Sequence, residues 1–298
     1  MKLPLVSVLM PAYNHEKFIG ETIESVLNQT LKNIELIIIN DGSTDNTDKV
    51  IKKFNDSRIK YIFQENKDAP FTINKAISMA KGKYISIINS DDVYHEDRLS
   101  LIYNLARENN SKFIFTDVEF IDDNSNIIDD KSHWYIKRAD EMKELLKNTG
   151  SFSTTFLSGN LTITTSTFFF ESGLVKEIGA FSTHIKYSHD HEFILRTCLS
   201  YEDKIFYLDQ KLLKYRLHIQ NTFKKSPIDS RAGQYSVIAG MLPQFIKNTE
   251  DRKVVQSMVD RLEMIHGLWI RDYVFIRNTI TWKITKPLRW FLSILSRN

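Results

Sequence analysis

The 298-residue sequence has one cysteine, no long apolar run and little excess charge. Because Cys198 has no second cysteine to pair with, an internal disulfide and a cysteine metal site are excluded, which favours a reducing compartment. No segment reaches the roughly 18 apolar residues of a membrane-spanning helix. The apolar start, residues 1–13, lacks a small-residue cleavage site, so we expect a strand there rather than a signal peptide. The net charge of +3 does not indicate nucleic-acid binding.

Two apolar patterns alternate in the first half of the sequence. Short apolar runs predict four strands, at residues 5–10, 35–39, 59–63 and 84–88. Between them, apolar residues at helical spacing predict three helices, at residues 16–29, around 50–54 and at 70–80. Continuously apolar strands with helices between them are typical of a parallel sheet covered on both faces. The first half therefore predicts an α/β fold.

Acidic residues follow two of these predicted strands. Asp41 comes after the second strand, and Asp91 and Asp92 come after the fourth. In open parallel sheets, ligands bind outside the carboxyl ends of the strands. Carboxylates that meet at such an edge suit a divalent cation, because hard cations prefer oxygen ligands. The alternative is that these residues only form turns and cap helices, a common use of aspartate.

The second half has a less regular pattern. We expect strands at residues 112–117 and 119–128, a mainly irregular region at 130–160 with a short helix near 140–147, a β-prone segment at 162–170, a helix at 190–199, a strand at 212–218 and mostly helical structure at 228–275. No internal repeat or low-complexity tract is present.

Four groups of residues, taken in order, resemble one known family. They are Pro11-Ala12-Tyr13-Asn14, Asn40-Asp41-Gly42-Ser43-Thr44-Asp45, Asn89-Ser90-Asp91-Asp92, and the pair His189-Asp190-His191-Glu192 with Tyr215-Arg216-Leu217-His218. With their flanking segments, these groups resemble the family 2 glycosyltransferases of the GT-A fold. The resemblance implies a GT-A catalytic domain over residues 1–222, with a mostly parallel sheet flanked by helices, and a helical C-terminal region over 223–298.

The resemblance implies transfer of a sugar from a nucleotide donor, usually a UDP-sugar, to an acceptor hydroxyl with inversion at the anomeric carbon. Asp41 would accept a hydrogen bond from the uracil ring, a role that suits an acceptor-only carboxylate. Glu16 would lie beside the nucleoside, and the floor beneath it would be formed by Pro11, Ala12 and Tyr13.

The resemblance also implies a metal site for Mn²⁺ or Mg²⁺ at the donor diphosphate. Asp92 is expected to be the direct ligand, with Asp91 near the ribose or the metal. His218 would approach the metal or the pyrophosphate, since a neutral imidazole is a good borderline ligand. Lys75 and Arg216 are candidate phosphate contacts, with a solvated surface position as the alternative for each.

Asp190 lies where the family has its catalytic base, which takes the proton of the acceptor hydroxyl as that oxygen attacks. The alternative role for Asp190 is to cap the helix that follows it. His189, His191 and Glu192 remain alternative bases, because a small misalignment would exchange them with Asp190.

Two positions depart from the family pattern. Asn89 stands where relatives commonly have aspartate, so a role for Asn89 on the metal is doubtful. Ile73 stands where many relatives have an arginine that helps to hold the nucleotide, which leaves the base specificity less certain. These departures keep open a second function, a catalytically degenerate nucleotide-binding or scaffold protein. A third function, a sugar-phosphate nucleotidyltransferase, is disfavoured because the loop after the first strand contains no glycine.

The end of the sequence is basic and aromatic. Residues 251–298 contain nine basic and four acidic residues, a net charge of +5, and residues 265–298 include three tryptophans. Such a segment suits an anionic membrane interface. We therefore expect a cytoplasmic protein, with peripheral contact at the inner membrane face near a glycan or lipid-linked acceptor. The alternative is an ordinary packing helix with a solvated basic face.

Overall fold

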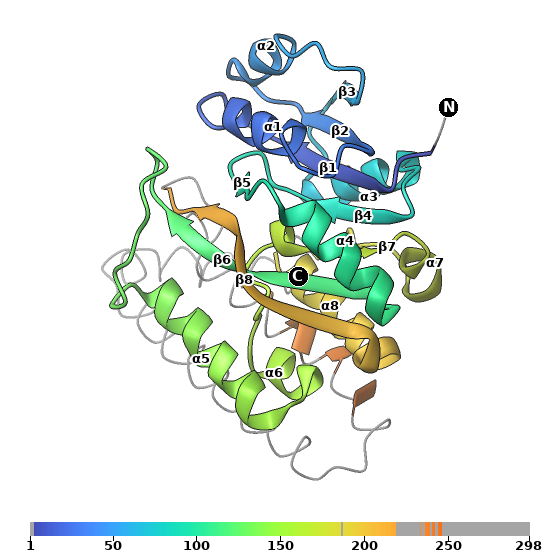
Figure 1. Cartoon of the computed structure of the whole chain (residues 1–298), viewed down its shortest axis with the longest axis vertical. Coiled ribbons are helices and arrows are strands. Elements are labelled where there is room, and N and C mark those ends of the chain that lie inside the picture. Colours follow the sequence, from blue (N-terminus) through green and yellow to red (C-terminus); the bar gives the residue numbers. More distant parts are fainter. Residues whose placement is uncertain are drawn as a thin grey trace, which may run out of the picture.

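The computed structural model describes residues 3–185 and 187–218, and eight positions between 233 and 245. Within this part of the chain, one sheet runs through the molecule (Figure 1). Its strands are β1 (Val6–Ala12), β2 (Ile34–Asp41), β3 (Ile59–Gln64), β4 (Tyr84–Ile87), β5 (Val93–Tyr94), β6 (Phe113–Ile121), β7 (Phe169–Glu171) and β8 (Ile205–Arg216). The helices are α1 (Ile19–Leu27), α2 (Thr47–Ile51), α3 (Ala69–Met79), α4 (Arg98–Asn109), α5 (Trp134–Thr149), α6 (Phe152–Ser158), α7 (Leu174–Ile178) and α8 (His189–Tyr201), with short 3-10 turns η1 (Thr165–Thr167) and η2 (Glu202–Lys204).

The strand order of the sheet is β3-β2-β1-β4-β7-β6-β8-β5. β1 pairs in parallel with β2 and β4, β2 pairs in parallel with β3, and β6 pairs in parallel with β8. β7 is antiparallel to both of its neighbours, and β5 is antiparallel to β8. The prediction of an α/β fold with a mostly parallel sheet is confirmed. Because β1, β2 and β4 run in the same direction, their carboxyl ends lie at one edge of the sheet.

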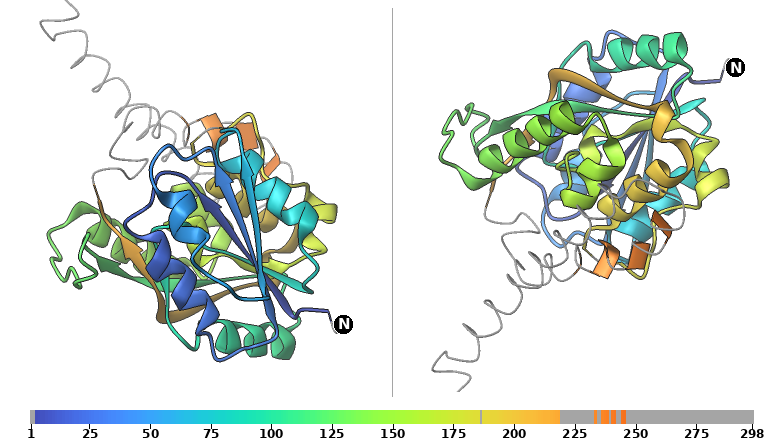
Figure 2. Two further views of the ribbon diagram at one scale, coloured as in Figure 1. Left: turned by 90° about the horizontal axis from the view of Figure 1, so that it is seen from above. Right: turned by 90° about the horizontal axis from the view of Figure 1, so that it is seen from below.

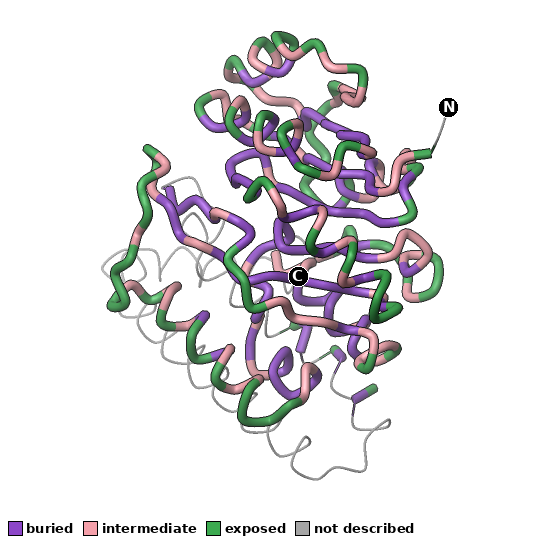
Figure 3. Tube along the Cα trace, viewed as in Figure 1, coloured by how far each residue is buried: buried purple, intermediate pink, exposed green. Residues whose placement is uncertain are grey.

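Both faces of the sheet are covered. Along β2, Leu36 and Ile38 belong to one buried cluster and Ile37 and Ile39 to the other, as the alternation of side chains along a strand requires. Helix α1 packs on the first face and α3 on the second, and these two helices flank the strands in Figure 2. The central strands are accordingly buried along most of their length (Figure 3).

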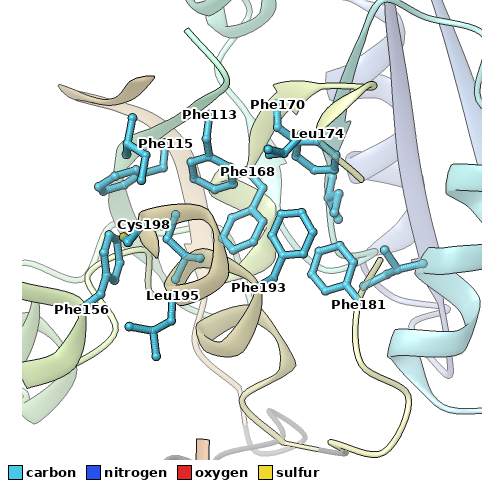
Figure 4. Close-up of a cluster of buried hydrophobic side chains, with 14 of the residues drawn as sticks. Phe113, Phe115, Phe156, Phe168, Phe170, Leu174, Phe181, Phe193, Leu195 and Cys198 are labelled. Atoms are coloured by element: carbon cyan, nitrogen blue, oxygen red, sulfur yellow. The ribbon is translucent and has the colours of Figure 1, made fainter. Parts of the chain in front are cut away.

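A cluster of phenylalanines joins α8 to the sheet (Figure 4). Phe193 of α8 stacks on Phe181, with ring centroids 4.3 Å apart, and also contacts Phe168 and Phe170. Aromatic side chains bury large apolar areas, so this cluster gives α8 a defined position. The first turn of α8 carries Asp190.

The second half differs from the sequence prediction in several elements, including the β-prone segment expected at 162–170, where η1 precedes the three-residue strand β7. β6 is one strand, not two, because a shift in register at Asp117 keeps the strand paired before the chain turns at residues 122–126. α5 is much longer than the helix expected at 140–147, and the adjacent helix α6 was not predicted. In α5 only Ala139 and Met142 are buried, so its apolar periodicity is weak. β8 begins seven residues before the expected strand.

Most of the predicted C-terminal region lies outside the described residues, including the whole basic segment 265–298. The eight described positions between 233 and 245 are helical. Val237, Ile238, Met241 and Phe245 are buried in the cluster that contains Phe193 of α8. Among the described residues, no helix is long and apolar enough to span a membrane.

Candidate active site

The loops after β1 and β2 form one continuous wall at the carboxyl edge of the sheet. Asn14 has a left-handed backbone, with φ of 53°, and its N–H donates to Ser43 Oγ at 2.9 Å. In return, Asn14 Oδ1 accepts from the N–H of Thr44 at 2.8 Å. Tyr13, just before this turn, is 46% exposed. Tyr13 therefore presents an accessible aromatic side chain beside the loop that follows Asp41.

The same wall includes Pro11 and Ala12, which end β1 beside β2, and Glu16 in the loop that follows. Ala12 is buried at the end of β1, and Pro11 is half-buried. Glu16 Oε2 accepts from both the backbone N–H and the side-chain amide of Asn46, at 2.9 and 2.7 Å. Because Asn46 is the residue at the start of α2, Glu16 fixes the turn between β2 and α2. The predicted contacts of these residues with a nucleoside stay predictions.

Asp41 ends β2 and is buried, with only 4% of its surface exposed. Its Oδ1 accepts from Gln64 Nε2 at 2.7 Å and from the backbone N–H of Lys67 at 3.0 Å. Lys75 of α3 donates from Nζ to Gln64 Oε1 at 2.8 Å. The structure thus brings Lys75 toward the Asp41 end of the site by way of Gln64, a residue that the sequence did not single out.

His15, Asp91 and His218 form the one group among the described residues whose side chains are arranged to hold a metal ion. One ligand atom from each lies within 4.8 Å of the other two. His218 Nε2 lies 2.8 Å from Asp91 Oδ2, and His15 Nε2 lies 3.9 Å from the same oxygen. His15 Nδ1 contacts Ser90 Oγ at 2.8 Å, which orients its ring. The group joins the loop after β1, the loop after β4 and the end of β8.

Asp91 and Asp92 are neighbours in the sequence, but their environments shift their pKa values in opposite directions. Burial acts to raise the pKa of Asp91, but the charge of His15 and the hydrogen bond with His218 outweigh it and lower that pKa below its ordinary value. Burial, and next the charge of Asp91, raise the pKa of Asp92 well above its ordinary value. The carboxylate that keeps its negative charge most readily is therefore Asp91.

Asp92 is fully buried and uses both carboxylate oxygens on the protein itself. Its Oδ2 accepts from Ser166 Oγ at 2.5 Å, and its Oδ1 accepts from the backbone N–H of Arg216 at 3.1 Å. Asp92 is absent from the group of possible metal ligands in the described part of the chain. Its expected role as the direct ligand stays a prediction. Its hydrogen bonds with Ser166 and Arg216 anchor the Asp91–Asp92 pair to η1 and β8.

Arg216 is also engaged with the protein. Its side chain is buried and donates to the backbone oxygens of Asp91 and Asp122 at 2.8 and 2.9 Å. It also pairs with Glu21 at 2.6 Å and lies over the ring of Phe18. These contacts orient the loop that carries Asp91, and they occupy the guanidinium that was a candidate for phosphate binding.

Asp190 is half-buried in the first turn of α8. Its Oδ2 accepts from Asn160 Nδ2 at 2.7 Å. The orientation of the Asn160 amide is defined, because its oxygen accepts from both the N–H and the hydroxyl of Thr162. Two of the alternative bases are held elsewhere: His191 contacts the carbonyl of Phe156 at 2.6 Å in the core, and Glu192 pairs with Arg196 at 2.5 Å.

Residues 160–167 connect Asp190 to Asp92. This segment begins with Asn160 and ends in η1, whose Ser166 binds Asp92. Asn89 adds two contacts to it, donating from Nδ2 to Thr164 Oγ1 at 2.9 Å and accepting from Thr165 Oγ1 at 3.2 Å. The amide at position 89 therefore holds this segment in place.

Two neighbouring tyrosines lie between Asp190 and the Asp91–Asp92 pair. The ring centroids of Tyr135 and Tyr215 are 6.1 Å apart. Burial, together with the charge of Asp190, raises the pKa of Tyr135 to about 12. Burial, the neighbouring Tyr135 and the charges of Asp92 and Asp91 raise the pKa of Tyr215 well above its ordinary value. The negative charges of Asp190, Asp91 and Asp92 therefore all act on this pair of tyrosines.

Sequence reasoning missed His15, Gln64 and Asn160. His15 follows the Tyr13-Asn14 pair at the same sheet edge as the aspartates, so its position gave a usable signal. Gln64 and Asn160 are uncharged residues in segments with no motif, and their partners are 23 and 30 residues away in the sequence. Only the folded structure brings them to the site.

The central mixed sheet with helices on both faces is the architecture of the GT-A glycosyltransferases. It superposes on S. aureus TarS 1-349 in complex with UDP-GlcNAc with a TM-score of 0.64 at 19% identity, covering 86% of this chain and 72% of that one. It also superposes on the mannosyltransferase PcManGT from Pyrobaculum calidifontis, in complex with GDP-Man and Mn²⁺, with a TM-score of 0.60 at 12% identity over 98% of this chain and 86% of that one.

The family follows from the sequence match. The family model "Glycosyl transferase family 2" matches residues 7–167, more than half of the chain, so the chain belongs to that family. A curated relative, the UDP-Glc:alpha-D-GlcNAc-diphosphoundecaprenol beta-1,3-glucosyltransferase WfgD of Escherichia coli, is 39% identical over 122 residues, which are 41% of this chain and 48% of WfgD. The chain spans about two thirds or less of the length of this and several other curated relatives.

Proposed function

We propose that the protein transfers a sugar from a UDP-sugar to a hydroxyl of a glycan or lipid-linked acceptor, with inversion, in the synthesis of a bacterial surface polysaccharide. The relative WfgD is named for a UDP-glucose donor and a diphosphoundecaprenol acceptor, and the fold neighbour TarS binds UDP-GlcNAc. The acceptor of such a reaction lies at the cytoplasmic membrane face, where we place the protein.

The observation that carries this proposal is that the carboxyl edge of the sheet holds Asp41 and the His15–Asp91–His218 group, with Asp190 linked to Asp92 through residues 160–167. Asp41 is an acceptor for a base, the His15–Asp91–His218 group suits a cation, and Asp190 is a carboxylate held by Asn160. A UDP-sugar has a base, a diphosphate and an anomeric carbon, one for each of these three kinds of side chain. Pro11, Ala12 and Tyr13 provide the surface beneath the nucleoside, and Glu16 holds the adjoining loop.

The residues present fit a divalent cation. Two imidazoles and one carboxylate offer ligand atoms within 4.8 Å of one another, close to the separation across an ion with bonds of about 2.1 Å. Imidazole suits transition metals better than Mg²⁺, so the set favours Mn²⁺ over Mg²⁺. When bound, the cation would neutralise charge on the departing diphosphate. This proposal departs from the sequence expectation that Asp92 is the direct ligand. Asp91, His218 and His15 hold the metal, and Asp92, engaged with Ser166 and Arg216, positions Asp91.

Asp190 acts on the acceptor in a single displacement. The acceptor oxygen attacks the anomeric carbon, and its proton passes to the carboxylate of Asp190. The bond from the anomeric carbon to the diphosphate oxygen breaks, and its electron pair leaves with the nucleoside diphosphate. Attack opposite the leaving group inverts the anomeric centre. The contact from Asn160 engages Oδ2 of Asp190, and Oδ1 accepts no hydrogen bond within the described part of the chain.

A donor screen tests the proposal. The full-length protein is titrated with UDP-, GDP- and CDP-sugars in the presence of Mn²⁺, and its melting temperature is measured, since a ligand that binds only the folded state raises it. The donor that stabilises the protein is then assayed with lipid-linked and free saccharide acceptors. Release of UDP with a new glycosidic bond supports the proposal, whereas release of pyrophosphate contradicts it. Binding without turnover across the whole panel would favour a degenerate relative.

The membrane contact of the basic tail is proposed on sequence grounds alone. Full-length protein should sediment with anionic liposomes, and a variant truncated after residue 264 should not. Equal sedimentation of the two proteins would contradict this contact.

A further inference from the structure

Asp41 has only one carboxylate oxygen that is uncommitted among the described residues. Its Oδ1 accepts two hydrogen bonds, from Gln64 Nε2 and from the N–H of Lys67. No described residue donates to its Oδ2. A ligand that approaches this carboxylate therefore meets a single free acceptor instead of a pair.

The contact between Gln64 and Asp41 is built into the sheet. The two residues are register partners at the ends of β3 and β2. The turn after Asp41 packs tightly on the segment after Gln64: Asn66 donates to the carbonyl of Asp41 at 3.0 Å, and a Cβ on Gly42 would lie 2.8 Å from the backbone nitrogen of Asn66. With its φ of 74°, Gly42 has a second reason to be glycine.

All polar atoms of the Gln64 side chain are engaged. Nε2 donates to Asp41 and also to Thr72 Oγ1, at 2.7 and 3.0 Å, while Oε1 accepts from Lys75 Nζ at 2.8 Å. The reversed amide would place its oxygen against a carboxylate and its NH₂ against an ammonium group. Lys75 therefore fixes the orientation in which Gln64 covers Asp41.

One free acceptor suits uracil and penalises guanine. Uracil presents a single donor, its ring N3–H, between two carbonyl oxygens. Guanine presents two adjacent donors, N1–H and the exocyclic amine, which together match both oxygens of a carboxylate. With Oδ1 already occupied, the second guanine donor is left without a good partner, and an unpaired buried donor disfavours the wrong ligand.

We propose that Gln64, held by Lys75, covers one oxygen of Asp41 so that the other alone contacts the base and selects uracil over guanine. This inference rests on the nucleotide-sugar donor proposed above. It assigns Lys75 a role at the nucleobase end of the donor rather than at the phosphates, and it makes Gln64 and Lys75 positioning residues that act through Asp41. They supply the base selectivity that the departure at Ile73 left open.

Binding of UDP and GDP to the full-length protein in the presence of Mn²⁺, measured by calorimetry, tests the proposal without any acceptor. The wild-type protein should bind UDP more tightly than GDP. Gln64→Ala and Gln64→Met should each lower the UDP/GDP affinity ratio about tenfold, the effect of one hydrogen bond to a charged group. Lys75→Met should shift the ratio in the same direction but by less.

The double variant Gln64→Ala/Lys75→Met separates the two possible roles of Lys75. If Lys75 acts through Gln64, the double variant should match Gln64→Ala within about a factor of two, since effects within one network are not additive. A phosphate contact would instead weaken UDP and GDP equally and add to the effect of Gln64→Ala, which would overturn the proposal. Lys53→Met, which removes one exposed lysine, is the charge-matched control and should leave both affinities unchanged.

The wild-type result distinguishes this inference from the proposed function. Equal affinity for UDP and GDP would overturn the selectivity and leave sugar transfer standing. Binding of neither nucleotide would overturn both. An unchanged UDP/GDP ratio in the Gln64 variants, with the melting temperature close to that of the wild type, would overturn only the role of Gln64.

Discussion

The two sides of the candidate site are held together in different ways. At the nucleoside end of the donor side, the polar side chains bind residues of the first three strands and their loops, as Asn14 binds Ser43 and Asp41 binds Gln64. On the side of Asp190, the contacts join segments that are far apart, as Ser166 binds Asp92 across 74 residues and Arg216 binds Asp92 across 124.

This difference suggests that the donor side is a preformed surface, whereas the reacting side depends on the correct placement of residues 160–167. Variants on the reacting side should therefore change catalysis and leave nucleotide binding intact. Variants on the donor side should change nucleotide or metal binding first.

Asp190→Asn should have the largest effect on catalysis. Loss of the base should lower kcat by about 1,000-fold, within the range for general acid–base catalysis. UDP affinity and the melting temperature should stay close to those of the wild type, because the hydrogen bond of Asp190 in the described part of the chain is with Asn160, outside the loops after β1 and β2. The measurement is transfer rate together with UDP calorimetry. Full activity in this variant would show that another residue, such as His189, is the base.

Asp91→Asn and Asp92→Asn form a matched pair of neighbouring substitutions. Asp91→Asn should weaken Mn²⁺ binding and lower activity by about 100-fold, because it removes the charged ligand of the His15–Asp91–His218 group. Asp92→Asn should retain Mn²⁺ affinity within a few-fold, since its side chain contacts Ser166 and Arg216. Metal titration by calorimetry measures both. The reverse result would identify Asp92 as the direct ligand.

Asn160→Ala should have an intermediate effect. Without the hydrogen bond from Nδ2, the carboxylate of Asp190 loses its fixed orientation, and kcat should fall by about tenfold. The KM for the donor should not change, because Asn160 lies on the reacting side. A rise in the donor KM with kcat unchanged would show that Asn160 serves the donor surface and would break the division between the two sides.

Glu35→Gln should affect stability without affecting the site. Glu35 is buried on β2, where Ser7 Oγ donates to it at 2.5 Å and the N–H of Lys81 donates at 2.7 Å. The variant should lose about 1–2 kcal/mol in the free energy of unfolding at pH 7 and keep full activity. Chemical denaturation measures the loss. A loss of activity at a temperature where the variant is fully folded would show that Glu35 also affects the site.

The pH dependence of that loss has a defined sign. Burial acts to raise the pKa of Glu35, but its bonds with Lys60, Ser7 and Lys81 outweigh burial and lower the pKa from its ordinary value of 4.5. A carboxyl group whose pKa is lowered by folding stabilises the protein above its ordinary pKa and loses that contribution as the pH falls through the lowered value. The stability difference between Glu35→Gln and wild type should therefore be full at pH 7 and should shrink below about pH 4.5.

The first half of the fold followed closely from local patterns. The predicted strands at 35–39 and 84–88 and the helix at 70–80 agree with β2, β4 and α3 to within a few residues. Their continuous apolar runs and helical spacing reflect burial on both faces of a parallel sheet. The prediction was weaker where burial is slight, as in α5, or where a register shift preserves one strand, as in β6.

The sequence alone determined the α/β class, the family and the acidic residues at the strand ends, because buried strands and strand-end turns are encoded by residues close together in the chain. Only the tertiary structure decided which partners those residues have. It brought His15 to Asp91 and His218, Gln64 to Asp41, and Asn160 to Asp190, through contacts between residues 23 to 203 positions apart. An uncharged side chain carries no local signal for such a partner, since its role depends on which strands become neighbours.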